Sequence, residues 1–390
     1  MLTKNIFYES FDIKKKKFSV NSSTKYFNLN NLIRKFPFLD SFTSKYKYSF
    51  KKKKLESFKK YSEINLIGMG GSILGSEAIY DFLNYKIKKK FHFFNNLQNY
   101  KNLKSNKKKL NIIISKSGNT LETFSNLNLI LTHQNKNKNL IITENQRNIL
   151  SKLANKLKAD VIEHKNYIGG RYSVLSEVGM VPAELMGLNE KKFKRLNQLV
   201  KNKSFINTLI KNVISIRQSM SLGKNNFVII NYDETLNNFL KWYQQLAAES
   251  LGKKGKGFFP IISTMPKDNH SLLQLFLDGP QNNFFTFFSS NETNSLKFKK
   301  SLTYKEFKVL DKKKIDDVLY AQKKATQNVF RKKKIPFRSF KIINRNEETL
   351  GELFTFFVLE TLVLSSYLKV NPVDQPSVEL IKKETKKILK

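Results

Sequence analysis

The chain has 390 residues, which is enough for two or three domains with sizeable hydrophobic cores. It has no cysteine and only four widely spaced histidines, which excludes disulfides and thiolate sites and argues against a protein metal site. Lysine and arginine outnumber acidic residues 71 to 31, but because they recur along the whole chain we interpret them as a solvated surface that attracts small anions, not as a nucleic-acid-binding face.

Residues 1–60 are basic and irregular, with Phe and Tyr scattered among lysines. We predict that they form an N-terminal segment of helices wrapped on the main body. No long apolar segment follows Met1, so we expect no signal peptide. Together with the lack of cysteine, this favours a cytoplasmic protein.

A short strand is predicted at residues 64–67, followed by a glycine turn at 68–72 and a helix that runs through Phe82. A dinucleotide fingerprint would need glycine where Ile73 stands, and no phosphate-loop lysine follows. The turn can still bring backbone N–H groups and the hydroxyl of Ser72 close to an anion.

A second strand at residues 111–114 stops at a hydroxyl-rich turn and is followed by a helical pattern. Asn119 is predicted as the helix N-cap, with Glu122 completing a capping box. A helix N-terminus with free N–H groups suits a dianionic phosphate, although an ordinary capped turn has the same pattern. The turn offers six consecutive residues: Ser115, Lys116, Ser117, Gly118, Asn119 and Thr120.

Further strands at residues 140–143 and 160–162 alternate with helical patterns, which predicts parallel pairing in a doubly wound sheet. Ligands bind beyond the carboxyl ends of such strands, where the glycine turn and the serine turn both lie. Gly169 and Gly170 then precede Arg171. The glycines would let the backbone approach a ligand beside a fixed cation, and the alternative is an arginine in a surface ion pair.

A second unit follows the linker at residues 201–222 and begins with a strand at 227–230. The next helix carries Gln245 and Glu249, which are four residues apart and share one helical face. A carboxylate and an amide presented together can act as base and positioner, although a solvated helix face has the same pattern. Two more strands are predicted at residues 260–262 and 284–288.

His270 lies between these two strands at the start of a short helix, where it can serve as an acid or base near neutral pH or have a structural role. Residues 291–335 indicate a lysine-rich insertion and a helix, and residues 337–343 a last strand.

An apolar segment at residues 350–368 passes a first test for a membrane span. It contains Glu352 and Glu360, and each carboxylate would cost roughly 2.5–3.5 kcal/mol at the bilayer centre. We therefore predict a helix buried between protein layers and no membrane partner. In the tail, Gln375 and Lys382 lie two turns apart on one face of a final helix, although Lys382 could equally be one more solvated lysine.

The order and wording of these motifs over residues 60–390 resemble the glucose-6-phosphate isomerase family. The glycine and serine motifs also occur in many sugar isomerase (SIS) domains, whereas the motifs at 169–173, 244–250 and 374–382 are specific in combination. The resemblance depends on Gly-Met-Gly-Gly-Ser (68–72), Ser-Lys-Ser-Gly-Asn-Thr-Leu-Glu-Thr (115–123), Gly-Gly-Arg-Tyr-Ser (169–173), Gln-Gln-Leu-Ala-Ala-Glu-Ser (244–250), the histidine at 270 and Asp-Gln-Pro-Ser-Val-Glu-Leu-Ile-Lys (374–382).

The resemblance implies an α/β fold with two doubly wound αβα sandwich domains of the SIS type, built on mainly parallel sheets. We expect the first domain at residues 61–200 and the second at 201–370. The N-terminal segment, residues 1–60, would precede them, and a C-terminal helix within 371–390 would return to the active site.

The resemblance also implies reversible conversion of glucose 6-phosphate to fructose 6-phosphate, by ring opening and a cis-enediol, without metal or cofactor. Glu249 would move the proton between C1 and C2, Arg171 would stabilise the enediolate, and His270 with Lys382 would open the sugar ring. The substrate would be held by Gly71, Ser72, Ser115, Lys116, Ser117, Gly118, Asn119, Thr120, Gln245 and Gln375.

In this family the histidine comes from the neighbouring subunit, which implies a homodimer with His270 supplied across the interface. The sequence departs from the family pattern in the tail, where Pro376, Ser377 and Ile381 replace an aromatic or small residue and glycine. Ser117 stands where threonine is usual, and the chain is short for the family.

Three alternatives remain open. A bifunctional phosphoglucose/phosphomannose isomerase shares the glycine and serine motifs, although it is not expected to have the Gly-Gly-Arg-Tyr-Ser motif at 169–173 or the tail motif at 374–382. A non-catalytic SIS protein that senses sugar phosphates would not need Glu249. A nucleic-acid binder recruited by charge would show steeply salt-dependent binding.

Overall fold

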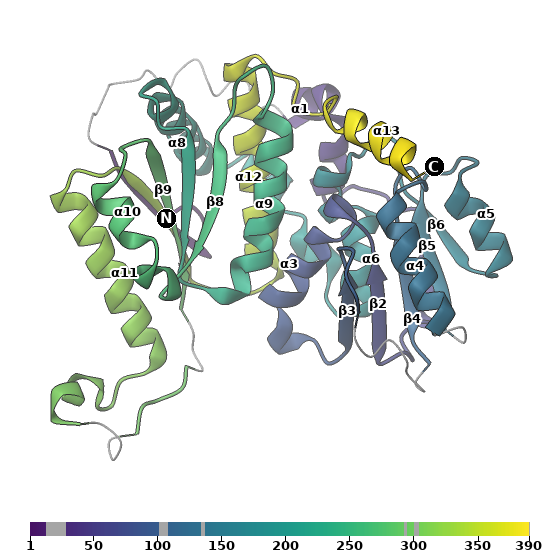
Figure 1. Cartoon of the computed structure of the whole chain (residues 1–390), viewed down its shortest axis with the longest axis horizontal. Helices are drawn as coiled ribbons and strands as arrows, with labels where there is room; N and C mark the ends of the chain where they lie inside the picture. Colours follow the sequence, from purple (N-terminus) through teal and green to yellow (C-terminus); the bar gives the residue numbers. More distant parts are fainter. Residues whose placement is uncertain (13–28, 101–107, 134–136, 292–294, 300–303, 390) are drawn as a thin grey trace.

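A computed structural model of the chain describes residues 1–12, 29–100, 108–133, 137–291, 295–299 and 304–389. They form two α/β units that lie side by side, each with its own five-stranded sheet (Figure 1). The predicted fold class, two doubly wound units with mainly parallel sheets, is confirmed.

The first sheet has the order β3-β2-β4-β5-β6, and all its strands are parallel. Its central strands are runs of β-branched and leucine residues that are buried on both faces, as expected when helices cover a parallel sheet. The strands are β2 (Glu63–Ile67), β3 (Lys90–Phe94), β4 (Leu110–Ile114), β5 (Lys138–Thr143) and β6 (Asp160–Glu163). The connections include α3 (Leu74–Phe82), η4 (Asn84–Lys86), α4 (Leu121–His133) and α5 (Ile149–Lys156).

The second sheet has the order β1-β10-β9-β7-β8, in which only β1 is antiparallel to its neighbour. Its strands are β1 (Ile6–Phe11), β7 (Asn226–Asn231), β8 (Phe259–Thr264), β9 (Asn283–Ser290) and β10 (Phe337–Ile342). Its helices are α8 (Lys203–Ser221), η7 (Glu234–Leu236), α9 (Asn237–Leu251), η8 (Lys267–His270), α10 (Leu273–Asp278), η10 (Lys305–Leu310), α11 (Ile315–Lys332) and α12 (Glu347–Leu368).

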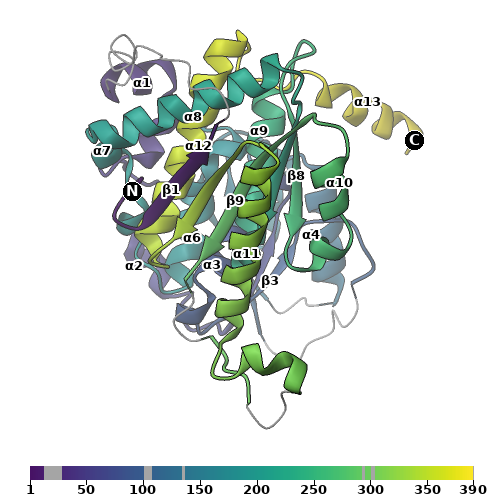
Figure 2. The ribbon, with the colours of Figure 1, turned by 90° about the vertical axis from the view of Figure 1, so that its left-hand side faces the viewer.

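The N-terminal segment is not purely helical, so that prediction is wrong in part. It contains α1 (Leu29–Lys35), η2 (Pro37–Phe42) and α2 (Lys52–Glu56), but its first residues form β1, an edge strand of the second sheet (Figure 2). β1 pairs with β10 in the register Ile6↔Ile342 to Phe11↔Phe337, which covers an otherwise open strand edge. Residues 13–28 of this segment lie outside the described residues.

Helix α12 is long and apolar enough to cross a membrane, yet 89% of its most apolar window is buried inside the protein. Its two interior carboxylates have partners: Thr3 donates to Glu352 at 2.7 Å, and Arg338 forms an ion pair with Glu360. The prediction of a helix buried between layers is therefore confirmed.

The two units meet through helices. Helix α3 of the first unit packs on α9 of the second and on α6 (Glu177–Leu185) (Figure 1). Within the second unit, α12 packs on α8 and α9, and Trp242 of α9 meets Phe354 of α12 edge-on, with ring centroids 4.7 Å apart. The elements that link the two sheets are η5 (Gly170–Leu175), α6 (Glu177–Leu185), η6 (Glu190–Phe193) and α7 (Leu196–Leu199). The junction brings the end of the glycine turn, which leads into α3, against α9.

Candidate active site

The glycine turn and the serine turn lie next to each other at the carboxyl ends of two paired strands. Gly68 follows β2 and Ser115 follows β4, and these strands pair through Ile67↔Ile113. A Cβ at Gly68 would lie 3.1 Å from the Cβ of Ser72 and 3.3 Å from the carbonyl oxygen of Ile114. The two turns therefore lie side by side at one end of the sheet, as predicted.

In the serine turn, the hydroxyl oxygens of Ser115 and Thr120 are 2.9 Å apart. Ser115 is buried, whereas Ser117 and Asn119 are exposed. Gly118 has φ +64°, and a Cβ there would lie 2.2 Å from Oδ1 of Asn148, so the position requires glycine. The turn thus has a buried hydroxyl pair on one side and an exposed rim on the other.

The predicted capping box of Asn119 and Glu122 is wrong by one residue. Helix α4 begins at Leu121, so Thr120 is the residue that precedes it. Oδ1 of Asn119 instead accepts a long hydrogen bond, 3.4 Å, from the backbone N–H of Ile149. The strand-to-helix turn is therefore one residue longer than predicted, and its last residue, Thr120, bonds Ser115.

The side chain of Lys116 points away from this hydroxyl pair. Its ammonium donates to the carbonyl of Asn166 at 2.6 Å and lies 3.4 Å from Oε1 of Glu144. Only its backbone is left for a ligand at the turn.

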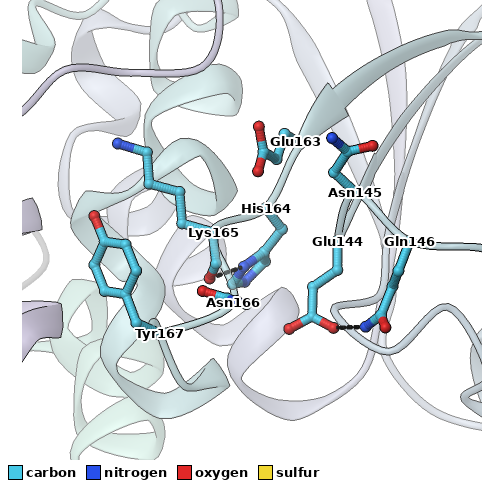
Figure 3. Close-up of a pocket in the computed structure, with 8 residues that line it drawn as sticks. All are labelled: Glu144, Asn145, Gln146, Glu163, His164, Lys165, Asn166 and Tyr167. Atoms are coloured by element: carbon cyan, nitrogen blue, oxygen red, sulfur yellow. Dashed lines mark hydrogen bonds between the residues drawn. The ribbon is translucent and has the colours of Figure 1, made fainter.

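A separate polar cavity of about 380 Å³ lies beyond Lys116, at the ends of β5 and β6 (Figure 3). Two carboxylates, Glu144 and Glu163, line it, and burial lowers the pKa of His164. Its lining consists of Glu144, Asn145, Gln146, Glu163, His164, Lys165, Asn166 and Tyr167.

The glycine turn is in backbone contact with the segment that carries Arg171. A Cβ at Gly71 would lie 2.1 Å from the carbonyl carbon of Gly170, so no larger residue fits there. The hydroxyl of Ser173 donates to the carbonyls of Gly170 and Gly71, at 2.7 and 3.2 Å. Small residues on both sides allow this approach, and it fixes η5 against the turn.

Arg171 joins helix α9 to the C-terminal tail and is only 4% exposed. Its Nη1 donates to Oε2 of Glu249 and to Oε1 of Gln375, both at 3.0 Å. Its Nη2 donates to the carbonyls of Pro372 and Asp374, and its Nε donates to the hydroxyl of Ser250 at 3.0 Å. Every nitrogen of the guanidinium is thus used, which fixes its plane beside Glu249.

Gln245 and Glu249 share one face of α9, as predicted, and Nε2 of Gln245 donates to Oε1 of Glu249 at 2.9 Å. A Cβ at Gly70 would lie 2.8 Å from the same Nε2, so the glycine turn touches Gln245. Oε1 of Gln245 is buried and has no hydrogen-bond partner within the described part of the chain. A continuous path of contacts therefore runs from the glycine turn through Gln245, Glu249 and Arg171 to Gln375.

Tyr172 and Ser250 also belong to this site. The sequence analysis gave them no role, although they lie within the motifs at 169–173 and 244–250. Tyr172 donates to the carbonyl of Pro372 at 2.8 Å, and its hydroxyl lies 2.9 Å from that of Ser250. Burial raises the pKa of Tyr172, so it remains a hydrogen-bond donor. Both residues hold the tail and Arg171 in place.

Neither Lys382 nor His270 contacts this path in the described chain. Lys382 lies on α13 (Val378–Ile388), which has no buried residue, and its ammonium is 2.6 Å from Oε1 of Glu379 (Figure 2). His270 is exposed at the end of η8. Their predicted part in ring opening stays a prediction.

Solved structures with a similar fold place the chain in a known class. It matches a hypothetical protein from Thermus thermophilus with a TM-score of 0.81 and 21% identity, over 95% of this chain and 94% of that one. It matches a glucose-6-phosphate isomerase from Chlamydia trachomatis with a TM-score of 0.68 and 17% identity, over 96% of this chain and 76% of that one. Both proteins therefore share the fold of this chain.

Residues 39–258 match the family model of phosphoglucose isomerase. The chain therefore belongs to the phosphoglucose isomerase family, the aldose–ketose isomerases that interconvert glucose 6-phosphate and fructose 6-phosphate. It is 32% identical to a probable glucose-6-phosphate isomerase of Methanococcus maripaludis, over 84% of this chain and 78% of the relative. It is 30% identical to the glucose-6-phosphate isomerase of Methanocaldococcus jannaschii, over 86% of each.

Proposed function

We propose that Glu249 is the base of this isomerisation and transfers a proton between C1 and C2 of the open-chain hexose phosphate. Its carboxylate is held on one oxygen by Gln245 and on the other by Arg171, yet the side chain is 28% exposed and so accessible to a substrate. A fixed, partly accessible carboxylate is what proton abstraction beside a carbonyl needs.

Arg171 would stabilise the negative charge that develops on the enediolate. It is a permanent cation in a fixed orientation, so it need not reorganise when the charge appears. Because Arg171 also donates to Oε1 of Gln375, the amide of Gln375 would lie beside the reacting carbons.

The phosphate would bind at the two turns. Ser72, Ser115, Ser117 and Thr120 would supply hydroxyls, and Gly71, Lys116 and Asn119 would supply backbone N–H groups. Gly118 would shape the turn around the phosphate, because its own N–H donates to the carbonyl of Ser115 at 3.2 Å. The N-terminus of α4 adds a favourable dipole at the same place. Their position at the carboxyl ends of parallel strands supports this assignment.

Gln245 and Gln375 would position the sugar hydroxyls. The strongest support is the buried and unpartnered Oε1 of Gln245, because a buried acceptor without a donor is unfavourable until a ligand supplies one. A substrate hydroxyl that donates to this oxygen would lie close to Glu249, because the nitrogen of the same amide donates to the carboxylate of Glu249.

Ring opening would be assisted by His270 and Lys382, with His270 contributed by a second chain of a homodimer in the cytoplasm. The exposure of His270 and of α13 is consistent with elements that complete a neighbouring site. Lys382 would first have to leave Glu379. Each step is a proton transfer between side chains and sugar, so we propose no metal or cofactor.

The observation that carries this proposal is the Glu249 carboxylate fixed between Gln245 and Arg171. The test is Glu249→Gln in a coupled spectrophotometric assay on fructose 6-phosphate, with the exposed Glu384→Gln as matched control. We expect Glu249→Gln to lower kcat by about 10²–10⁴-fold and the control to be unchanged. A fully active Glu249→Gln enzyme would place the base elsewhere. Equal turnover of mannose 6-phosphate would instead favour the bifunctional alternative.

A further inference from the structure

The second sheet has a cavity of its own at the carboxyl ends of its strands. It has a volume of about 890 Å³ and lies beyond β7, β8 and β9, with α11 as one wall (Figure 2 shows α11 against β9). None of the residues that line it belongs to the candidate active site. The carboxyl end of a parallel sheet is the usual place for a ligand, so the chemistry of this lining decides whether one can bind.

Lys323 is the buried cation of this cavity. It lies on α11, is 5% exposed, and donates to the hydroxyl of Ser289 at the end of β9 at 2.8 Å. Within the described residues, no carboxylate forms an ion pair with it. Burial lowers its pKa to about 8, so it is still mainly protonated at neutral pH.

Lys341 is a second cation on the same face. It stands opposite Ser289 in the register of β10 and β9, so the two side chains point to the same side of the sheet. The ammonium groups of Lys341 and Lys323 lie 5.5 and 5.7 Å from the centroid of the same ring, Tyr320. Two positive charges therefore converge on one end of the cavity.

The lining also includes four carboxylates, Asp233, Glu234, Asp316 and Asp317, so the cavity as a whole has both signs of charge. Asp233 accepts from Arg345 at 3.1 Å, and Asp317 accepts from the backbone N–H of Lys314 at 2.8 Å. Outside the lining, Glu9 accepts from Arg331 at 3.3 Å. A buried ammonium without a counter-ion is costly, and a second ammonium nearby raises the cost. An anion seated between the two lysines would offset it.

We propose that this cavity is a second ligand site, distinct from the active site, which binds a small phosphorylated metabolite through its phosphate group. Lys323 and Lys341 neutralise the phosphate, the hydroxyl of Ser289 donates to it, and the remaining volume accommodates the organic part of the ligand. Three groups of this kind on a strand end and a helix are a common way to bind phosphate.

The test measures binding of inorganic phosphate by calorimetry to the full chain and to variants. Lys323→Met removes the buried charge at similar volume, and Lys324→Met, on the adjacent exposed position of the same helix, removes the same charge outside the cavity. We expect the wild type and Lys324→Met to bind two phosphates per chain, and Lys323→Met to bind one. Ser115→Ala weakens the other site, so failure of one site is distinguishable from failure of the other.

Lys341→Gln provides a second test that does not alter a buried position. We expect it to weaken phosphate binding at this site by at least about tenfold, as loss of one charge-assisted contact should. Identical stoichiometry and affinity in Lys323→Met, Lys341→Gln and Lys324→Met would overturn the proposal and leave Lys323 as a structural donor to Ser289.

Discussion

Replacing Arg171 by lysine tests whether its positive charge alone is sufficient or whether its hydrogen bonds are also needed. The guanidinium bonds Glu249, Gln375, Ser250 and two backbone carbonyls of the tail. A lysine ammonium has its three donors on one atom, so it cannot reach both Glu249 and the tail. The variant keeps a positive charge near the site and loses most of the network.

The expected losses follow from those contacts. At least two hydrogen bonds from a charged donor disappear, each with a net value of about 1.5–3 kcal/mol, although water can replace part of them at the exposed tail. We therefore expect unfolding to become easier by about 3 kcal/mol. Because Arg171 would no longer be aligned with the enediolate, kcat should fall by about 10²–10³-fold.

Two measurements check this prediction: kcat and KM from the coupled assay, and the free energy of unfolding from urea titration. Tyr172→Phe is the control, because it removes one bond to the same tail while the contact of Arg171 with Glu249 remains. We expect it to cost only about 1 kcal/mol. An Arg171→Lys enzyme with kcat within about threefold of the wild type would refute the reasoning, since a role in charge stabilisation requires a larger loss.

Three further outcomes are expected. Gly71→Ala should destabilise the fold by about 3 kcal/mol or more in urea titration, because its Cβ would lie 2.1 Å from the carbonyl carbon of Gly170, whereas Gly169→Ala, with its nearest neighbour at 3.6 Å, should be tolerated. Ser115→Ala should raise KM for glucose 6-phosphate about tenfold with a smaller change in kcat, and an unchanged KM would contradict the proposed phosphate position. Burial raises the pKa of Glu77 from 4.5 to about 7, so its contribution to stability falls as pH rises through that interval. Glu77→Gln should therefore stabilise the protein by about 3 kcal/mol at pH 8 and by little at pH 4, and an equal gain at both pH values would contradict this.

Local sequence pattern was sufficient to predict the central strands of the first sheet. The runs at 64–67, 111–114 and 140–143 are apolar, short and bounded by turn residues, and they form β2, β4 and β5. β3 was not predicted, because Lys90–Phe94 begins with lysine and has only aromatic residues and histidine after it. β3 forms because it pairs with β2, and the local sequence around Lys90–Phe94 carries no information about that pairing.

The candidate site also combines contacts that the local sequence predicts with contacts that it does not. The spacing of Gln245 and Glu249 predicts their shared helical face, and the structure confirms it. The contact of Arg171 with the tail joins residues about two hundred positions apart, and no periodicity indicates it. The cavity around Lys323 was missed because α11 looks like one more lysine-rich solvated helix until its packing on β9 is known.

The position of β1 has a consequence for how the chain is made. β1 is synthesised long before its partner β10, so it stays unpaired until β10 has been made. Thr3 and Asn5 donate to Glu352, which lies near the start of the apolar helix α12. Removing residues 1–12 would thus leave this buried carboxylate without two of its hydrogen-bond donors and leave the edge of the sheet open to another chain, and we expect that defect to cause aggregation during expression.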